Sequence, residues 1–331
     1  MTTEAANTLV KETPSSVGKD LTPSSQQPEI VIQRSPSPSW REYPHYPVVV
    51  VTGLLAIAIT VAWWSKTDIS VLLQTAAIRR GQLWRLLTSV FPHVDILHLV
   101  FNIYWLWVFG TSVENRFGPS RTAGLFVLLA IGSNSLDFAL GRGGVGLSGI
   151  GYGLFGLLWV LSKRDDRFRT AMDSRTVKLF IAWFFFCILL TVGHQYSVAN
   201  VAHAAGALLG ILLGFAISTP KQRPLLVGAT SILVLFGLAA ATIARPRLNL
   251  SAYGGYEEEQ WGYEDLIANQ NQEAIHWLRD STLYQPKVAG FWFNLGLAYA
   301  RVGDTAAASS AFARAHQLEP DNPQFAEPSA R

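Results

Sequence analysis

Long apolar runs separated by short polar segments dominate the middle of the chain. Most of these runs approach the ~20 residues that a helix needs to cross ~30 Å of hydrocarbon. The fourth is shorter, which is expected of a helix that its neighbours bury and that begins in a water-filled cavity. The pattern therefore predicts seven transmembrane helices. The runs are residues 46–64, 96–112, 122–140, 147–162, 177–193, 198–218 and 225–244.

Composition agrees with a membrane protein. Half of the 331 residues are hydrophobic and only 15% are charged, whereas a soluble domain carries about 25% charged residues. The net charge of +3 is small, and basic residues cluster beside the apolar runs. We therefore interpret these basic residues as a signal of membrane orientation and not as a nucleic-acid site. The lipid bilayer is the expected partner. The single Cys187 excludes a disulfide framework or cysteine metal site within the chain, and no metal or organic cofactor is indicated.

The hydrophobic pattern also divides the chain into domains. We expect an all-α protein: a polytopic bundle with a six-helix core, a seventh helix, and a small soluble helical domain. Residues at the two ends are rich in small and polar types that cannot offset chain entropy, so we expect disorder there. The predicted parts are a tail at 1–44, the core at 45–218, the seventh helix at 219–246, helical repeats at 247–322 and a second tail at 323–331.

Basic loops predict the orientation of the helices. They follow the second, fourth and sixth runs, near residues 116–121, 163–169 and 221–223, while the loops after the third and fifth runs carry one basic residue and none. Positive loops remain inside, so we expect a cytoplasmic N-terminus and an extracytoplasmic C-terminus. The basic segment 66–85 disagrees, but its Trp84 and leucines are typical of an element lying in the membrane interface.

The C-terminal region shows a period of 34 residues that is typical of tetratricopeptide repeats. The better repeat matches at Trp292, Leu295, Gly296, Tyr299, Gly303, Ala308, Phe312, Ala315 and Pro320. One period earlier the match is degenerate, because Glu258 and Asp265 stand where the pattern has Trp and Tyr. A generic amphipathic helical hairpin is the alternative. Two repeats are fewer than the ~3 needed for independent stability, so we expect them to pack against the membrane domain or a partner.

Four polar side chains fall at one depth of the predicted bundle. His98 and Asn102 lie in the first turns of the second run, Ser148 opens the fourth, and His203 lies early in the sixth. These three helices run in the same direction, so the side chains share a level just below the outer surface. Polar groups inside a membrane are costly and usually functional.

Glycine stripes beside Ser148 and His203 predict how the two residues meet. Small residues at every fourth position let transmembrane backbones approach closely. Contact between the stripes would bring the His203 ring within hydrogen-bond reach of Ser148. The stripes are Gly149, Gly153 and Gly156 on one helix, and Gly206, Gly210 and Gly214 on the other.

This arrangement suits acyl transfer by an activated serine. A serine hydroxyl is a weak nucleophile until a base takes its proton, and a histidine such as His203, with an ordinary pKa near ~6.5, suits that task. Candidate oxyanion donors are the backbone N–H of Ser148, the Asn102 side chain and the His98 ring. No metal takes part in this scheme.

Two neighbouring residues complete the predicted site. Tyr152, one turn below the serine, is placed to pack against the imidazole. Asp137 is the one acidic residue at that depth; we interpret it as a structural or loop-facing carboxylate, which leaves a Ser-His dyad, and its role stays open. His93, five residues before His98, receives a structural role because it would lie on another helix face.

Other classes of protein remain open on the residues alone. Gly146-Leu147-Ser148-Gly149 is short, and Ile150 stands where the soluble hydrolase elbow needs glycine. A transporter also gathers polar residues at one depth, although it favours inverted repeats and the midplane. A membrane-anchored scaffold would explain the repeats but not the four polar residues.

Taken together, the motifs resemble the rhomboid intramembrane serine proteases over about residues 46–218. The segments that carry the resemblance are Gly81–Thr88, His93–Asn102, Glu114–Gly118, Gly146–Gly149 and Ala202–Gly206. The resemblance implies that Ser148 is the nucleophile and His203 the base, that His98 and Asn102 bind the oxyanion, and that Tyr152 stacks on the base. It further implies that the 66–85 segment is the family's interfacial loop and that the last apolar run is an appended seventh helix.

The sequence therefore predicts an intramembrane serine endopeptidase that cleaves transmembrane-anchored protein substrates near the outer membrane face. A bacterial plasma membrane is the expected location. The repeats are expected to bind substrate or an adaptor, or simply to fold outside.

Overall fold

The computed structural model describes residues 40–193, 195–196, 198–251 and 254–325, and the regular elements within these ranges are all helical. The predicted all-α fold is confirmed. Most of the tail predicted at 1–44, and residues 326–331 of the second tail, lie outside the described residues. Residues Trp40–His45 form a 3-10 helix, η1, directly before the first membrane helix.

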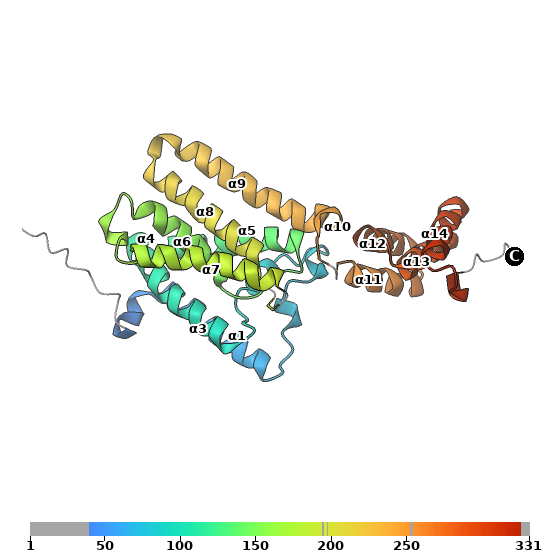
Figure 1. Cartoon of the computed structure of the whole chain (residues 1–331), viewed down its shortest axis with the longest axis horizontal. Helices are drawn as coiled ribbons and strands as arrows, with labels where there is room; N and C mark the ends of the chain where they lie inside the picture. The colour runs from blue at the N-terminus through green and yellow to red at the C-terminus, as the bar shows by residue number, and fades with distance from the viewer. Residues whose placement is uncertain (1–39, 194, 197, 252–253, 326–331) are drawn as a thin grey trace, which may run out of the picture. The chain divides into compact units, whose positions relative to one another are not determined.

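The described residues contain an apolar helix for each of the seven apolar runs, and Figure 1 shows their arrangement. Among these residues, six of the helices are long and apolar enough to cross a membrane, and α6, which corresponds to the fourth run, is shorter. The elements are α1 (Pro47–Trp64), α3 (Ile96–Trp105) continued by the π-helical turn η4 (Leu106–Gly110) and α4 (Thr111–Phe117), α5 (Pro119–Leu140), α6 (Ser148–Leu161), α7 (Ser174–Val192), α8 (Asn200–Ser218), and η6 (Pro220–Gln222), α9 (Arg223–Ala239), η7 (Ala240–Ala244) and α10 (Arg245–Leu248).

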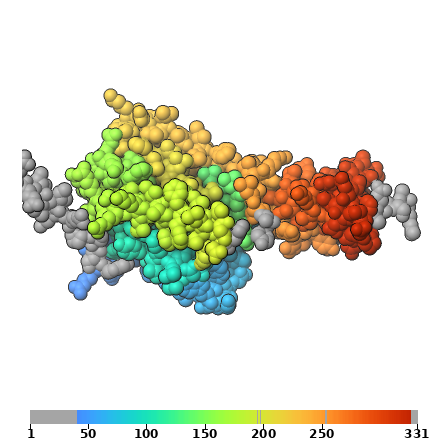
Figure 2. All heavy atoms as spheres, in the orientation of Figure 1, coloured from blue at the N-terminus to red at the C-terminus, as the bar shows by residue number. Residues whose placement is uncertain are grey.

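Helix α6 lies at the centre of the bundle, whereas α7 lies at its surface. Leu154, Leu157 and Leu158 of α6 are fully buried, as expected of a helix that is apolar on every side. Helix α7 instead exposes large apolar side chains such as Phe185 and Leu189, and its yellow-green atoms lie across the middle of the membrane domain in Figure 2. An apolar exposed surface of this kind suits contact with lipid.

Carboxylates cap the starts of two membrane helices, a distant one for α1 and the adjacent one for α3. Glu114 accepts the backbone N–H groups of Val48 and Val49 at 2.9 and 3.0 Å and so caps α1. Asp95 accepts the backbone N–H of His98 at 2.8 Å and caps α3. Because the first N–H groups of a helix have no partner inside it, these bonds decide the first residue of each helix.

The segment between α1 and α3 is folded into short helices: η2 (Ser70–Leu72), η3 (Ala76–Ile78) and α2 (Arg85–Thr88). The Arg85 side chain is 8% exposed and donates to the carbonyl oxygen of Leu73 at 3.0 Å. The buried Arg85 guanidinium therefore holds this segment together through its hydrogen bond to the backbone.

The C-terminal region forms two helical hairpins, α11 (Tyr256–Ile267) with α12 (Asn271–Tyr284) and α13 (Ala289–Arg301) with α14 (Thr305–Leu318), followed by η8 (Pro323–Phe325). Glycine allows close packing inside each hairpin. A Cβ at Gly262 would lie 2.5 Å from Leu278, and one at Gly296 would lie 2.6 Å from Phe312.

Candidate active site

Ser148 is the first residue of α6 and follows a glycine-rich loop, residues 141–147. Gly143 and Gly146 of this loop have φ values of +83° and +106°, which favour glycine. A Cβ at Gly146 would also lie 2.7 Å from a ring carbon of His98. Glycine therefore lets the His98 ring lie against the loop that presents the serine.

His203, in the first turn of α8, contacts Ser148 directly: its Nε2 lies 2.9 Å from the serine Oγ. The backbones of α6 and α8 touch beside this pair. A Cβ at Gly206 would collide with the carbonyl oxygen of Gly149, and one at Gly210 with that of Gly153. The two glycine stripes therefore meet, and their contact brings the hydroxyl and the imidazole together.

Tyr152 supports the imidazole from one side. The two rings stack with their centroids 4.5 Å apart and their planes at 25°. The Tyr152 hydroxyl donates to the carbonyl oxygen of Phe180 at 3.3 Å, which fixes the ring. The Nδ1 atom of the same imidazole is buried and has no hydrogen-bond partner among the described residues.

Asp137 contacts the backbone of the histidine helix and not the imidazole. It is buried, and its Oδ1 accepts the N–H of Ala202 at 3.3 Å. Its other oxygen lies beside Gly144 of the serine loop. The carboxylate therefore joins that loop to the start of α8.

His98 and Asn102 lie on α3, and their polar atoms are engaged differently. The Asn102 amide donates to the carbonyl oxygen of His98 at 2.9 Å. His98 Nδ1 is buried without a partner in the part of the chain that the structure describes. The His98 ring lies against the serine loop, because a Cβ at Gly146 would lie 2.7 Å from it.

His93 lies closer to the site than the helix-face argument suggested. It precedes α3, because Asp95 caps that helix, so the helical spacing does not apply. Its Nδ1 lies 2.8 Å from the carbonyl oxygen of Phe91, and its Nε2 accepts the N–H of Leu147 at 3.4 Å. Burial, with a smaller contribution from His98, lowers the pKa of His93 to about 3. The neutral ring can therefore accept this hydrogen bond.

Gln74 and Ser89 are site residues that sequence reasoning missed. Gln74 donates to the carbonyl oxygen of Gly144 at 2.9 Å and to the Ser89 hydroxyl at 3.0 Å. The carbonyl oxygen of Ser89 accepts the N–H of Gly146 at 3.1 Å. Both residues hold the serine loop, but they lie far from it in sequence and no motif marks them.

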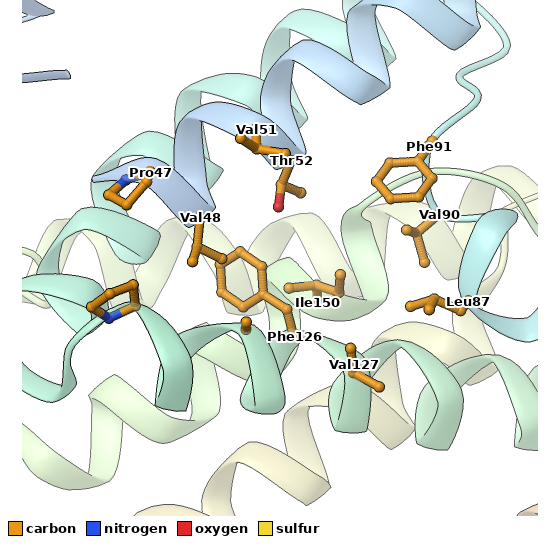
Figure 3. Close-up of a pocket in the computed structure, with 12 residues that line it drawn as sticks. Pro47, Val48, Val51, Thr52, Leu87, Val90, Phe91, Phe126, Val127 and Ile150 are labelled. Carbon is orange, nitrogen blue, oxygen red and sulfur yellow. The ribbon is translucent and has the colours of Figure 1, made fainter. Parts of the chain in front are cut away.

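An apolar groove of about 440 Å³ lies between α1 and α5 (Figure 3). Val48, Val51 and Thr52 line one side, and Phe126 and Val127 line the other, with Thr52 as the one polar side chain of the lining. Neither the serine nor the histidine of the pair lines it, so the groove is separate from their contact.

Comparisons with known proteins identify the same families as the motifs. Residues 80–220 match the rhomboid domain family, and residues 289–322 match the tetratricopeptide repeat. The chain is 27% identical over 171 residues to the rhomboid protease GlpG of Yersinia pseudotuberculosis serotype I (strain IP32953), covering 51% of this chain and 57% of the relative. It is 27% identical over 174 residues to GlpG of Salmonella paratyphi A (strain ATCC 9150 / SARB42), covering 51% and 62%.

The chain spans less than two thirds of the length of these relatives. The resemblance drawn from the motifs is nevertheless confirmed by the matching domain, and the apolar helices make the chain an integral, multi-pass membrane protein. By these comparisons, residues 80–220 are similar to the rhomboid domain family, and residues 289–322, later in the sequence, are similar to the tetratricopeptide repeat.

Proposed function

We propose that this chain is an intramembrane serine endopeptidase in which Ser148 is the nucleophile and His203 the general base. The observation that carries the proposal is the 2.9 Å contact between the serine Oγ and the histidine Nε2. The likeness to proteins named rhomboid protease supports the same reaction class. A base at this distance can take the hydroxyl proton as the oxygen attacks a carbonyl.

The catalytic cycle follows from the atoms around this pair. As Ser148 Oγ attacks the scissile carbonyl carbon, its proton passes to His203 Nε2, which later gives the proton to the leaving amine. The resulting imidazolium has no carboxylate partner at Nδ1 among the described residues. The face of the Tyr152 ring, 4.5 Å away, supports the positive charge instead. Water then hydrolyses the acyl-enzyme with the same base.

Oxyanion donors are proposed from two elements. The first N–H groups of α6, including that of Ser148, have no helical partner and point toward the start of the helix. The His98 ring beside Gly146 and the Asn102 amide are the further candidates. Asn102 must exchange the His98 carbonyl for the oxyanion, so its contribution arises only as substrate reacts. Each donor is worth about 10²–10³ in rate.

The proposed substrates are transmembrane-anchored proteins cleaved near the outer membrane face. A substrate helix must unfold locally before a base or nucleophile can reach its carbonyl groups, because these are hydrogen-bonded in a helix. The basic loops at residues 163–169 and 221–223 support a cytoplasmic position for the opposite ends of α6 and α8. The proposed topology has a cytoplasmic N-terminus, an extracytoplasmic C-terminus and, by default, a bacterial plasma membrane.

The decisive test is replacement of the nucleophile in the full-length protein. Ser148→Ala should abolish cleavage of a model single-pass substrate and abolish labelling by a fluorophosphonate probe, and His203→Ala should do the same. Ser162→Ala, at the other end of the same helix, is the matched control and should keep both activities. Turnover that persists in folded Ser148→Ala protein would remove this serine from its role.

The second tetratricopeptide hairpin, α13 and α14, is the proposed site for a substrate or adaptor protein. Repeats of this type generally bind other proteins, and this hairpin carries the family match. Deleting residues 286–331 should then change cleavage of some substrates and leave others unaffected. Equal losses for every substrate would argue against selective recruitment.

A further inference from the structure

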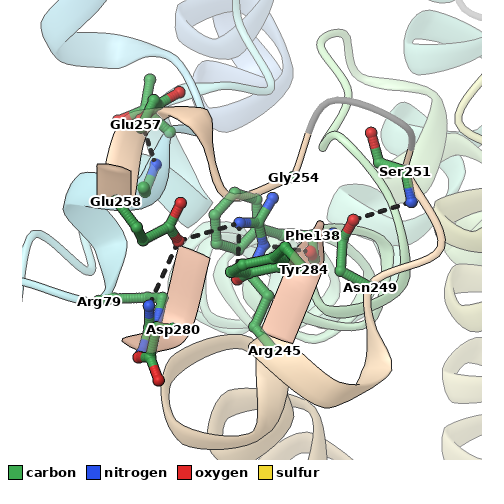
Figure 4. Close-up of polar contacts among 12 residues, drawn as sticks. Arg79, Phe138, Arg245, Asn249, Ser251, Gly254, Glu257, Glu258, Asp280 and Tyr284 are labelled. Carbon is green, nitrogen blue, oxygen red and sulfur yellow. Dashed lines mark hydrogen bonds and ion pairs between the residues drawn. The ribbon is translucent and has the colours of Figure 1, made fainter. Parts of the chain in front are cut away.

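A cluster of buried charges joins the C-terminal hairpins to the membrane domain (Figure 4). Arg79, directly after η3, pairs with Glu258 of α11 at 3.3 Å and with Asp280 of α12. Arg245, at the start of α10, lies 3.6 Å from the same Glu258 and donates to the Tyr284 hydroxyl at 3.1 Å. The four charged side chains are at most 10% exposed.

These charges balance only when both parts of the chain are in place. The membrane side supplies two arginines, and the hairpin supplies two carboxylates. A buried charge without its partner is strongly destabilising. Removal of one member of the cluster would therefore leave its partner buried and uncompensated, so the docked arrangement needs all four side chains.

Aromatic contacts extend the same interface. The guanidinium of Arg80 lies 3.8 Å from the ring centre of Trp261 and 5.0 Å from that of Trp277. Its Nη2 also lies 3.8 Å from Asp265. Stacking of an arginine on tryptophan adds attraction that does not depend on a single ion pair.

The departures of the first repeat from the tetratricopeptide pattern coincide with this interface. Glu258 and Asp265 occupy the positions that Trp292 and Tyr299 hold one period later. In the second repeat these aromatic side chains pack against the core of the hairpins. In the first repeat the two carboxylates pair with arginines of the membrane domain.

We propose that α11–α12 is a docking hairpin, in which acidic side chains replace the usual aromatic ones to bind the arginines of residues 79–80 and Arg245, and that its docking holds the serine loop in its active geometry. The partner of this surface is thus the membrane domain of the same chain. The second half of this proposal rests on the proposed function.

Two lines of hydrogen bonds connect the docking hairpin to the serine loop. In the first, Glu257 accepts the N–H of Ala76 at 2.7 Å, and Gln74, two residues earlier, donates to the Gly144 carbonyl oxygen at 2.9 Å. Gly144 lies in the loop that ends at Ser148. Release of the hairpin would therefore free the segment that holds this loop.

The second line runs through the arginine that pairs with Glu258. Arg245 donates to the carbonyl oxygen of Phe138 at 2.9 Å and to that of Gly141 at 3.3 Å. Asn249 donates to the same Gly141 oxygen at 2.6 Å. Gly141 directly follows the last residue of α5 and is the first residue of the serine loop, so the hairpin acts on this end of the loop as well.

The test compares junction variants in the full-length protein. Glu258→Gln removes one buried charge, Glu257→Ala removes the acceptor for Ala76, and Glu257→Gln keeps an acceptor oxygen. Glu259→Ala is the matched control, because Glu259 bonds Asn294 inside the repeats at 2.7 Å and not the membrane domain. Asp265→Tyr restores the tetratricopeptide residue and should weaken docking while leaving the hairpin folded.

Two readouts separate docking from catalysis. Hydrogen exchange in peptides covering residues 74–80 and 141–147 reports the contacts themselves and needs no enzyme activity. The rate at which a fluorophosphonate labels Ser148 reports the site with a probe too small to need the repeats. We expect Glu258→Gln, Glu257→Ala and Asp265→Tyr to exchange faster in both peptides and to label about tenfold more slowly. Glu257→Gln and Glu259→Ala should behave like the unaltered protein.

The outcomes are distinct. Unchanged exchange in folded Asp265→Tyr and Glu257→Ala protein overturns the docking role. Faster exchange with an unchanged labelling rate overturns the effect on the serine loop. If Glu258→Gln does not fold, the exchange and labelling of Asp265→Tyr and Glu257→Ala decide between these outcomes. If the unaltered protein does not label at all, the proposed function fails, and the exchange data still judge the docking.

Discussion

Replacing Gly206 by alanine tests whether backbone contact between α6 and α8 aligns Ser148 and His203, the proposed catalytic pair. The new Cβ would collide with the carbonyl oxygen of Gly149 and lie 3.1 Å from its carbonyl carbon and 3.3 Å from the nitrogen of Gly153. These are backbone atoms that cannot rotate away. The helices must therefore separate beside Ser148 and His203.

The size of the effect follows from the distances. Carbon atoms in contact prefer separations of about 3.5–4.0 Å, so the carbonyl carbon alone requires a shift of about 0.4 Å (3.5 minus 3.1). Added to the 2.9 Å contact between serine and histidine, this gives about 3.3 Å, outside the range of about 2.6–3.2 Å expected for proton transfer. We expect a loss of up to about 10²-fold in rate and about 1–3 kcal/mol in the free energy of unfolding.

The assay is the rate of fluorophosphonate labelling and of substrate cleavage, with thermal unfolding in detergent as the measure of stability. Gly151→Ala is the matched control, because it lies on α6 and a Cβ there meets no atom within 4 Å. It should keep full activity. If folded Gly206→Ala protein is as active as Gly151→Ala protein, close backbone contact is not what aligns the pair.

Three further predictions concern single side chains. Tyr152→Leu should slow labelling about two- to tenfold, since stacking on His203 is worth ~0.5–1.5 kcal/mol, while Tyr152→Phe keeps the ring and should lose less; equal losses would point to the hydroxyl. The pKa of His93 is about 3 in the folded protein, against an ordinary value of 6.5. Between these two values the unfolded chain binds the proton and the folded protein does not. The stability contribution of His93 is therefore present above pH 6.5 and is lost as the pH falls toward 3, by at most about 1.4 kcal/mol per pH unit. Thermal unfolding over a pH series should therefore show a flatter acid slope for His93→Gln, and an unchanged slope would contradict this reasoning. Glu114→Ala leaves two N–H groups at the start of α1 without partners and should lower the free energy of unfolding by about 1–2 kcal/mol, measured by thermal unfolding, whereas no change would show that the cap is dispensable.

Local pattern was enough to predict the helices and the residues that meet. Apolar run length determines which segments can span a membrane, and glycine spacing determines which helix faces can touch. Both are properties of neighbouring residues in the sequence. The contact between Ser148 and His203 was therefore foreseeable from two stripes that each carry a reactive residue at one end.

Contacts between distant segments were not foreseeable in the same way. His93 received a helical position in the sequence argument, but Asp95 caps α3 after it and leaves its ring against Leu147. Gln74 holds the serine loop from a segment whose basic residues suggested only an interfacial element. In each case the partner is chosen by how chain segments pack, and no periodic signal records that choice.

The sequence by itself determined the number of membrane helices, their apolar faces and the pair of reactive side chains, because each depends on spacing along one or two helices. The sequence also identifies Glu258 and Asp265 as departures from the repeat pattern, but it does not explain why carboxylates occupy these positions. Only the tertiary structure decided that these carboxylates bind Arg79 and Arg80. Charge pairing acts through space between segments far apart in the chain, so its partners are known only once the chain is folded.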